Sequence, residues 1–149
     1  MRVPGVGVVL AIIVGWPAWV DAADVTAMVT QEVRPVLVRN DHNRLFKLTV
    51  TCQKPYVVVD SLELSLDGTD DRGDIDVIEV FGGDAFNPLI RFGTAVSVRG
   101  RRVTIAGHAR LEKGENHFWV SCRLEGDANL DHYVDGTCVQ IETSAGGIR

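Results

Sequence analysis

Short stretches in which apolar and polar residues alternate make up most of the chain after residue 22. Alternation with a period of two places the apolar side chains on one face of a β-strand. The clearest case is residues 44–52, where Phe46, Leu48, Val50 and Cys52 share one face. Similar patterns, separated by breaks rich in Gly, Asp and Asn, predict strands over residues 23–33, 44–52, 59–68, 75–83, 101–107, 114–126 and 137–144.

The spacing of these runs favours an all-β domain. No stretch after residue 22 keeps apolar residues at the i, i+3, i+4 spacing of an amphipathic helix, so we expect no long helix there. Seven or eight short strands over about 120 residues suit an antiparallel two-sheet β-sandwich. Jelly-roll and Ig-like topologies share this pattern, and both stay open. The predicted sandwich covers residues 23–145, and residues 146–149 are expected to be a tail.

The first 22 residues have the features of a secretory signal peptide. Arg2 precedes an apolar run from Val3 to Val20, and Val20 and Ala22 occupy the −3 and −1 positions of a cleavage site. The run is about long enough to span a bilayer, so an uncleaved membrane anchor is the alternative. However, glycines and prolines interrupt it, and no cluster of Lys and Arg follows. We therefore expect cleavage after Ala22 and a secreted, periplasmic or cell-surface protein that has no membrane partner.

The charge of the chain does not favour nucleic acid as a partner. The formal net charge is −5, and the basic residues Arg101, Arg102 and Arg123 are scattered along the sequence. Binding to nucleic acid or to an anionic membrane needs a gathered basic patch. We therefore expect no nucleic-acid partner.

The chain has three cysteines, and export would place them in an oxidising compartment. One disulfide and one remaining thiol is then the simplest count. If residues 117–124 and 136–143 pair as antiparallel strands, Cys122 and Cys138 lie opposite each other and can bridge. The two segments disagree about which face is buried, however. A bridge to Cys52 and three buried thiols therefore remain alternatives.

One acidic segment, residues 126–136, resembles a calcium loop. Asp127, Asn129, Asp131 and Asp135 stand at positions 1, 3, 5 and 9 of such a loop. Position 6 lacks the usual glycine, position 12 lacks the usual acid, and strands rather than helices are predicted on both sides. We therefore interpret the segment as a polar turn.

A second acidic segment, residues 65–76, contains Asp67, Asp70, Asp71, Asp74 and Asp76. Aspartate and glycine at this density are typical of a solvated turn between two strands. We therefore expect neither a metal ion nor a cofactor.

Signatures of catalysis are missing from the sequence. It contains no GxSxG nucleophile elbow, no HExxH motif and no glycine-rich phosphate loop. Trp119 is the most ambiguous residue, because on a strand it points to the opposite face from Phe118. It is either covered by the core or a loop, or exposed as a platform on which a sugar could stack.

Three stretches occur in an order that is found in a known family. In residues 45–81 the matching positions are Leu62, Leu64, Leu66, Gly68, Thr69, Asp74 and Ile75. In residues 100–124 they are Leu111, Gly114, Asn116, Phe118, Trp119, Val120, Ser121 and Leu124. In residues 127–141 they are Ala128, Leu130, Asp131, Val134, Asp135 and Ile141.

With this order and spacing, residues 24–143 resemble the N-terminal β-sandwich domain associated with BNR-repeat neuraminidases. The resemblance implies a non-catalytic accessory domain of a secreted exo-α-sialidase system, whose chemistry resides in a separate propeller. The arginine triad, the Tyr/Glu nucleophile pair and the Asp-boxes of that propeller are not in this sequence, so no catalytic residue is expected. The resemblance also places Ala128 and Leu130 inward, in the connection between the last two strands.

The resemblance makes glycans, or a sialidase catalytic propeller, the expected partners. Four residues are candidates for glycan binding: Trp119, Tyr133, His117 and Arg91. A freestanding carbohydrate-binding module is the alternative function. Less favoured is the front end of an enzyme whose propeller hydrolyses terminal sialic acids.

Overall fold

The computed structural model describes residues 24–31 and 33–149, which form nine strands and one short 3-10 helix. These residues contain no α-helix, and no helix among them is long and apolar enough to cross a membrane. The predicted signal peptide, residues 1–22, lies outside the described residues. The elements are β1 Val25–Gln31, β2 Asn43–Cys52, β3 Val58–Ser65, η1 Arg72–Asp74, β4 Ile75–Gly82, β5 Arg91–Ser97, β6 Arg102–Arg110, β7 Gly114–Leu124, β8 Thr137–Thr143 and β9 Gly146–Ile148.

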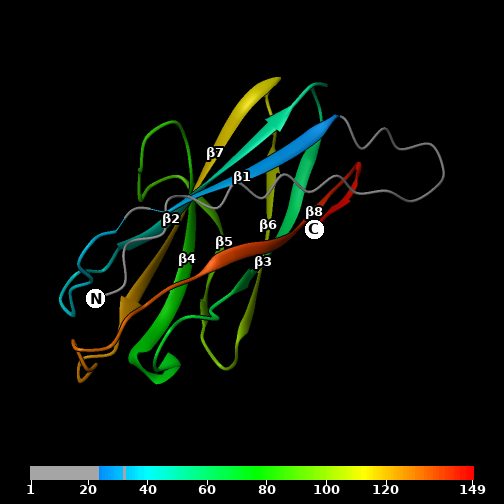
Figure 1. The fold of residues 1–149 in the computed structure, drawn as a ribbon. Coiled ribbons are helices and arrows are strands. Elements are labelled where there is room, and N and C mark those ends of the chain that lie inside the picture. Colours follow the sequence, from blue (N-terminus) through cyan, green and yellow to red (C-terminus); the bar gives the residue numbers. More distant parts are fainter. Residues whose placement is uncertain (1–23, 32) are drawn as a thin grey trace.

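The strands form two antiparallel sheets that face each other as a β-sandwich (Figure 1). The five-stranded sheet has the order β1-β2-β7-β4-β5, and the four-stranded sheet has the order β6-β3-β8-β9. The chain therefore passes from one sheet to the other at five of its connections, including those that follow β2, β3 and β7. The order 2-7-4-5 against 6-3-8 is that of a jelly roll. The structure thus decides between the two topologies that the sequence left open.

The core lies between the sheets and is built from alternate residues of each strand. On β2 the residues Phe46, Leu48, Val50 and Cys52 are all buried, which confirms the predicted alternation. Burying such a side chain stabilises the fold by about 1.5–3 kcal/mol. In the same core the rings of Phe92 on β5 and Phe118 on β7 pack edge to face, with centroids 5.5 Å apart.

Strand β5 was missed because its sequence does not alternate. Ile78 of β4 pairs with Val96 of β5, and Val80 pairs with Phe92. The segment of β5 between these two pairs is longer than the segment of β4, so β5 contains a bulge. Gly93 lies in this bulge with φ of 68°, and a Cβ there would stand 2.1 Å from the carbonyl oxygen of Ala106 on β6. At this edge of the sandwich β5 and β6 approach each other closely, and β5 therefore lacks the regular alternation of apolar and polar residues.

Strand β9 corrects the predicted domain boundary. Residues 146–149 were expected to be a tail, but Gly146–Ile148 pair with the end of β8. The half-buried Ile148 also packs against the core. A segment with two glycines and one apolar residue carries no strand pattern, so its pairing depends on the neighbouring strand.

The strand pairing on which the predicted Cys122–Cys138 disulfide rested is wrong, because β7 and β8 are not neighbours. Cys122 lies in the five-stranded sheet and Cys138 in the four-stranded sheet, and both point into the core between them. Together with Cys52 they are buried free thiols. Burial raises the pKa of Cys122 and of Cys138 to about 12, so both stay protonated near neutral pH. The two face patterns disagreed because β8 contains a β-bulge between Cys138 and Gln140, which places Cys138 on the same buried face as Ile141.

Candidate functional site

The outer face of the five-stranded sheet, which points away from the second sheet, is covered near its centre. On β4 the residues Ile78 and Val80 point into the core, so Glu79 and Phe81 point to the outer face. Both are nevertheless buried, with Phe81 0% and Glu79 5% exposed. A large ring and a carboxyl group therefore lie beneath a second layer of side chains outside the sandwich core.

Two loops supply this cover, and both lie at the left of Figure 1. His42 ends the loop between β1 and β2, and its ring packs edge-on against Phe81 with centroids 5.1 Å apart. Phe86 lies in the loop between β4 and β5 and packs edge-on against Phe81 at 5.4 Å and Trp119 at 6.5 Å. Such aromatic pairs contribute about 0.5–1.5 kcal/mol beyond the burial of their surface. The loops are thus anchored to the outer face through aromatic rings.

A row of paired residues crosses the outer face. Trp119 on β7 is the direct neighbour of Lys47 on β2 and of Phe81 on β4. Phe81 in turn pairs with Arg91 on β5. The indole Nε1 of Trp119 donates a hydrogen bond to the carbonyl oxygen of Gly83, at 3.0 Å, which fixes the orientation of the half-buried ring.

Two cations of β2 approach the ring of Trp119. The guanidinium carbon of Arg44 and the Nζ of Lys47 each lie 5.6 Å from its centroid. Arg44 is also 5.6 Å from the centroid of Phe86. Within the described residues, neither cation takes part in an ion pair with a carboxylate. Cation–π attraction is favourable, but it leaves the two positive charges without neutralisation.

The remaining charges are paired around Glu79. Its carboxylate lies 2.8 Å from the guanidinium of Arg91 and 3.1 Å from Nδ1 of His42. The side chain of Glu79 is 6% exposed, whereas that of Arg91 is 44% exposed. The buried carboxylate of Glu79 is therefore paired with the guanidinium of Arg91, which remains in contact with water.

Ser121 adds a buried hydroxyl group under these charges. It points to the outer face because its neighbours Val120 and Cys122 point into the core. It pairs with Arg44 on one side and with Glu79 on the other. Its Oγ is buried without a hydrogen-bond partner among the described residues. We call the following residues the outer-face cluster: His42, Arg44, Lys47, Glu79, Phe81, Phe86, Arg91, Trp119 and Ser121.

The four predicted glycan-binding residues do not form one site. Trp119, His117 and Arg91 share the outer face, where His117 contacts the Oγ1 of Thr49 through Nδ1, at 3.1 Å. Tyr133 lies in the loop between β7 and β8 and is 76% exposed. The structure thus places three of the four on one face, where Trp119 and Arg91 belong to the outer-face cluster, and it separates Tyr133 from them.

Sequence reasoning named Trp119 and Arg91 and missed the other seven members of the cluster, among them Arg44, Glu79 and Phe86. One signal was present, because the segment 75–81 is apolar on both faces of its strand. A strand with apolar residues on both faces is covered on both sides. The covering loops could not be identified from the pattern, since they carry no periodicity.

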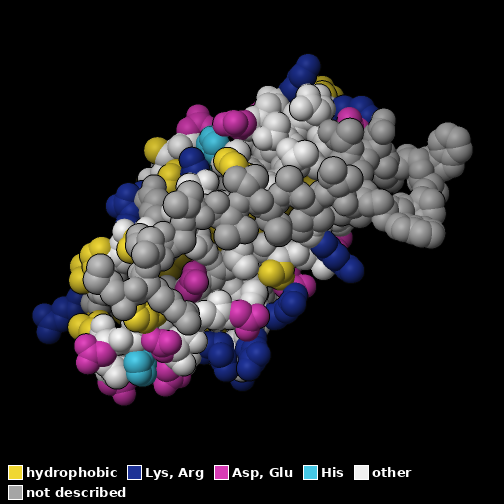
Figure 2. Space-filling view, in the orientation of Figure 1, with side chains coloured by type: hydrophobic (Ala, Val, Ile, Leu, Met, Phe, Trp, Pro, Cys, Tyr) yellow, Lys and Arg dark blue, Asp and Glu magenta, His cyan; other side chains and the backbone are white. Residues whose placement is uncertain are grey.

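The two acidic segments of the sequence meet at one end of the sandwich, which we call the loop end (residues 66–74 and 125–136). Asp70 accepts a hydrogen bond from the backbone N–H of Tyr133, and the backbone N–H of Asp70 donates to the carbonyl oxygen of Tyr133. Oγ1 of Thr69 donates to the carbonyl oxygen of Asp135. Figure 2 shows acidic side chains and a histidine gathered where Figure 1 places these loops.

Residues 126–136 form a polar turn, as predicted, but one of the two side chains expected to point inward does not. The side-chain oxygen of Asn129 accepts from the backbone N–H of Asp131, and Asp135 accepts from Gln31, so two of the calcium-like positions are engaged within the chain. Ala128 packs against the core as expected. The prediction that Leu130 points inward is wrong, because it is 63% exposed. Backbone hydrogen bonds to the facing loop hold the turn, so Leu130 need not anchor it.

Asp71, Asp74 and His132 could hold a metal ion, since one potential ligand atom from each lies within 4.8 Å of the others. These groups already have partners in the protein. Asp71 caps the 3-10 helix by accepting from the N–H of Gly73, and Asp74 accepts from Asn129 and contacts Nδ1 of His132 at 2.7 Å. The arrangement is therefore a hydrogen-bonded loop contact.

The pair formed by Asp74 and His132 has shifted pKa values. The hydrogen bond from the backbone of Asn129, followed by that with His132, lowers the pKa of Asp74. The hydrogen bond with Asp74 raises the pKa of His132, and the charges of Asp70 and Asp71 add to this. The contact is therefore strongest when the carboxylate is ionised and the imidazole is protonated.

Replacing His132 by Gln should lower the melting temperature more at pH 5.5 than at pH 8.5. The contribution of His132 is fully present below about 6.5, the ordinary histidine pKa, and is lost as pH rises through its raised pKa. The contribution of Asp74 is present above about 3.9 and is lost as pH falls through its lowered pKa. His108→Gln is the matched control, because the contact of His108 with Asp60 is longer, at 3.9 Å, and joins two exposed side chains, so it should stabilise little. Equal losses for His132→Gln at both pH values would show that the ion pair does not stabilise the loops.

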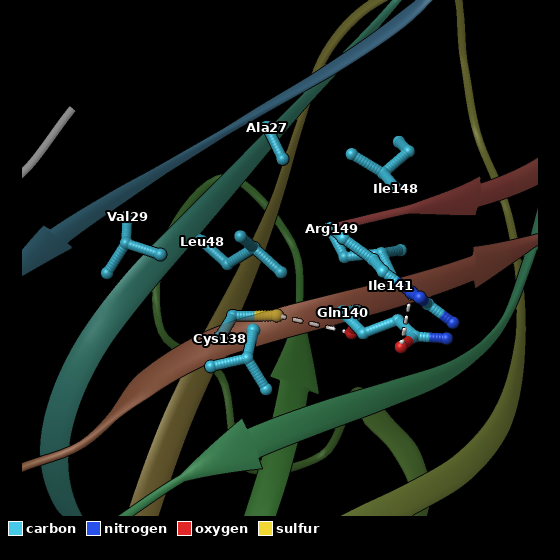
Figure 3. A pocket seen from close by; sticks show the side chains of 9 residues that line it. Ala27, Val29, Leu48, Cys138, Gln140, Ile141, Ile148 and Arg149 are labelled. Carbon is cyan, nitrogen blue, oxygen red and sulfur yellow. Dashed lines mark hydrogen bonds between the residues drawn. The ribbon is translucent and has the colours of Figure 1, made fainter. Parts of the chain in front are cut away.

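A small apolar cavity lies at the edge of the sandwich, between β1 and β2 on one side and β8 and β9 on the other (Figure 3). Its volume is about 20 Å³, and its walls include Ala27, Val29, Leu48, Cys138 and Ile148. A cavity of this size holds little more than one water molecule. It is therefore too small for a sugar.

Comparison with solved structures finds a similar fold within a larger protein. The chain superposes on "Hadza microbial sialidase Hz136" with a TM-score of 0.69 and 20% sequence identity, over 81% of this chain. It covers only 29% of that chain. At this identity the likeness shows the fold alone. No family model and no curated protein matches the sequence.

Proposed function

We propose that the chain is a non-catalytic accessory domain of an exported sialidase-type system and that it binds glycans through the outer-face cluster. The observation that carries this proposal is the fold similarity to a part, 29%, of a sialidase chain. A domain of this size beside a catalytic unit would contribute attachment to the glycan or to the catalytic unit. The resemblance of residues 24–143 to the N-terminal domain associated with BNR-repeat neuraminidases supports the same role.

The outer-face cluster supports glycan binding better than the loop end does. It combines aromatic rings, which favour the apolar face of a sugar, with charged and hydroxyl groups that can hydrogen-bond its edge. The loop end offers one exposed aromatic ring, Tyr133, among carboxylates. Because Trp119 is half-buried and lies under Arg44 and Lys47, we expect a sugar to meet the rim of its ring and the cations together.

Two measurements on the purified chain test this proposal. A fluorogenic sialoside should not be hydrolysed, because the catalytic groups of a sialidase are absent from the sequence. A glycan array should give binding that is weakened by Trp119→Phe and unchanged by Tyr133→Ala. Turnover of the sialoside would contradict the non-catalytic role. Binding that depends on Tyr133 and not on Trp119 would move the site to the loop end.

A freestanding carbohydrate-binding module is the second candidate. The same outer-face cluster supports it, since binding needs no catalytic partner. The gene sequence that follows Arg149 distinguishes the two, because an in-frame propeller would make the domain part of a sialidase. In that case the whole protein would hydrolyse terminal sialic acids, and this domain would serve it.

A further inference from the structure

We infer that the outer-face cluster selects anionic glycans, with the acidic group of the sugar bound by Arg44 and Lys47. This inference rests on the proposed glycan-binding function and specifies its ligand class. The ligand is a saccharide that carries a carboxylate or a sulfate. Its apolar surface contacts Phe86 and the rim of Trp119.

The first step is the imbalance of charge within the cluster. Of the three permanent cations, Arg91 is neutralised by Glu79 at 2.8 Å. Arg44 and Lys47 approach aromatic rings instead, and both approach the same ring, Trp119, at 5.6 Å. Both cations therefore lie around one ring without a carboxylate partner among the described residues, and an anion bound beside them would supply the missing negative charge.

The second step is the position of these cations. Both belong to β2, where the neighbouring strand β7 holds Trp119 directly opposite Lys47. The aromatic contacts place the charged groups over rings that the fold itself fixes, since Trp119 donates to Gly83 and packs against Phe86. Cations that are held in place before binding lose less conformational freedom when the ligand arrives.

The third step is the contrast with the rest of the protein. The chain has a net charge of −5, and acidic groups gather at the loop end. An acidic ligand is disfavoured over such a surface and favoured only where cations are in excess.

Ser121 adds a buried hydroxyl group without a partner among the described residues, and it pairs with Arg44 across β2 and β7. An unpaired buried donor of this kind is unfavourable, and a polar ligand or its bound water can provide the missing acceptor.

The experiment compares three ligands that share one core: lactose, 3′-sulfolactose and 3′-sialyllactose. Titration calorimetry of the purified chain should give at least tenfold tighter binding for the two acidic sugars than for lactose, and this difference should shrink at high salt. The affinities for 3′-sulfolactose and 3′-sialyllactose show whether the site prefers a sulfate or a carboxylate. Arg44→Gln and Lys47→Gln should each weaken binding of the acidic sugars about tenfold, as expected for one charge-assisted contact.

Lys113→Gln is the matched control, since it removes an exposed lysine outside the cluster and should leave all affinities unchanged. Lys47→Arg should retain binding because it keeps the charge, and thermal unfolding confirms that each variant is folded. Equal affinity for lactose and the acidic sugars, or unchanged binding in both glutamine variants, would overturn the inference and leave the proposed function standing. Absence of binding to all three sugars, together with an empty glycan array, would overturn both.

Discussion

Phe81→Ala should lower the free energy of unfolding by about 3–5 kcal/mol, the range found when a buried phenylalanine is truncated. Phe81 is fully buried, yet it lies outside the sandwich core, on the outer face. Its ring contacts His42, Phe86 and the guanidinium of Arg91. The variant therefore loses the anchor of both covering loops as well as buried apolar surface. Chemical denaturation of the variant and the wild type measures this difference.

Phe118→Ala provides the comparison, because Phe118 is also buried but points into the core. Both variants should lose similar stability. Only Phe81→Ala should loosen the loops around Trp119, which a red shift of its fluorescence under native conditions would report. Phe81→Leu, with an expected loss of about 1–1.5 kcal/mol, keeps a folded protein if the alanine variant unfolds. A loss below about 1 kcal/mol for Phe81→Ala would show that the outer face is not tightly covered.

Gly93→Ala should be the second most damaging change, with a loss of about 2–5 kcal/mol. An alanine at φ of 68° adopts a left-handed conformation that costs about 1–2 kcal/mol. Its Cβ would also stand 2.1 Å from the carbonyl oxygen of Ala106, so β5 and β6 must separate. Relief of such overlap costs a further amount of about 1–3 kcal/mol. Urea denaturation measures the total.

Two other glycines separate these contributions. Gly114 has φ of 101°, but no heavy atom lies within 4 Å of the position that a Cβ would take, so Gly114→Ala should show the backbone cost alone. Gly100 has neither constraint, and Gly100→Ala should change stability by less than about 0.5 kcal/mol. If Gly93→Ala costs no more than Gly114→Ala, the close approach of β5 and β6 does not hold in solution.

Local pattern was sufficient for the fold class and for the faces of individual strands. The alternation in residues 44–52 identified the buried face of β2, and the opposition of Phe118 and Trp119 followed from strand geometry. Strand pairing depends on contacts between distant segments, which periodicity does not record. For this reason the sequence paired residues 117–124 with 136–143, whereas the structure puts β7 and β8 in different sheets.

The candidate site was predictable only in part, for the same reason. Trp119 and Arg91 could be named from the sequence as candidates for glycan binding. Their association with Arg44 depends on the register of β2, β7, β4 and β5, and Phe86 reaches the cluster from a loop without periodicity. Tyr133 looked equivalent to Trp119 in the sequence, but the topology placed it at the loop end.

The central claim, that the functional surface is the outer-face cluster, is tested most directly by an NMR titration of the ¹⁵N-labelled chain with 3′-sialyllactose. The indole N–H of Trp119 and the backbone amides of Lys47 and Phe86 should shift together and saturate at one affinity. The amides of His132 and Tyr133, at the loop end, should stay in place. Shifts confined to His132 and Tyr133, or a spectrum that does not change at millimolar sugar, would contradict the claim.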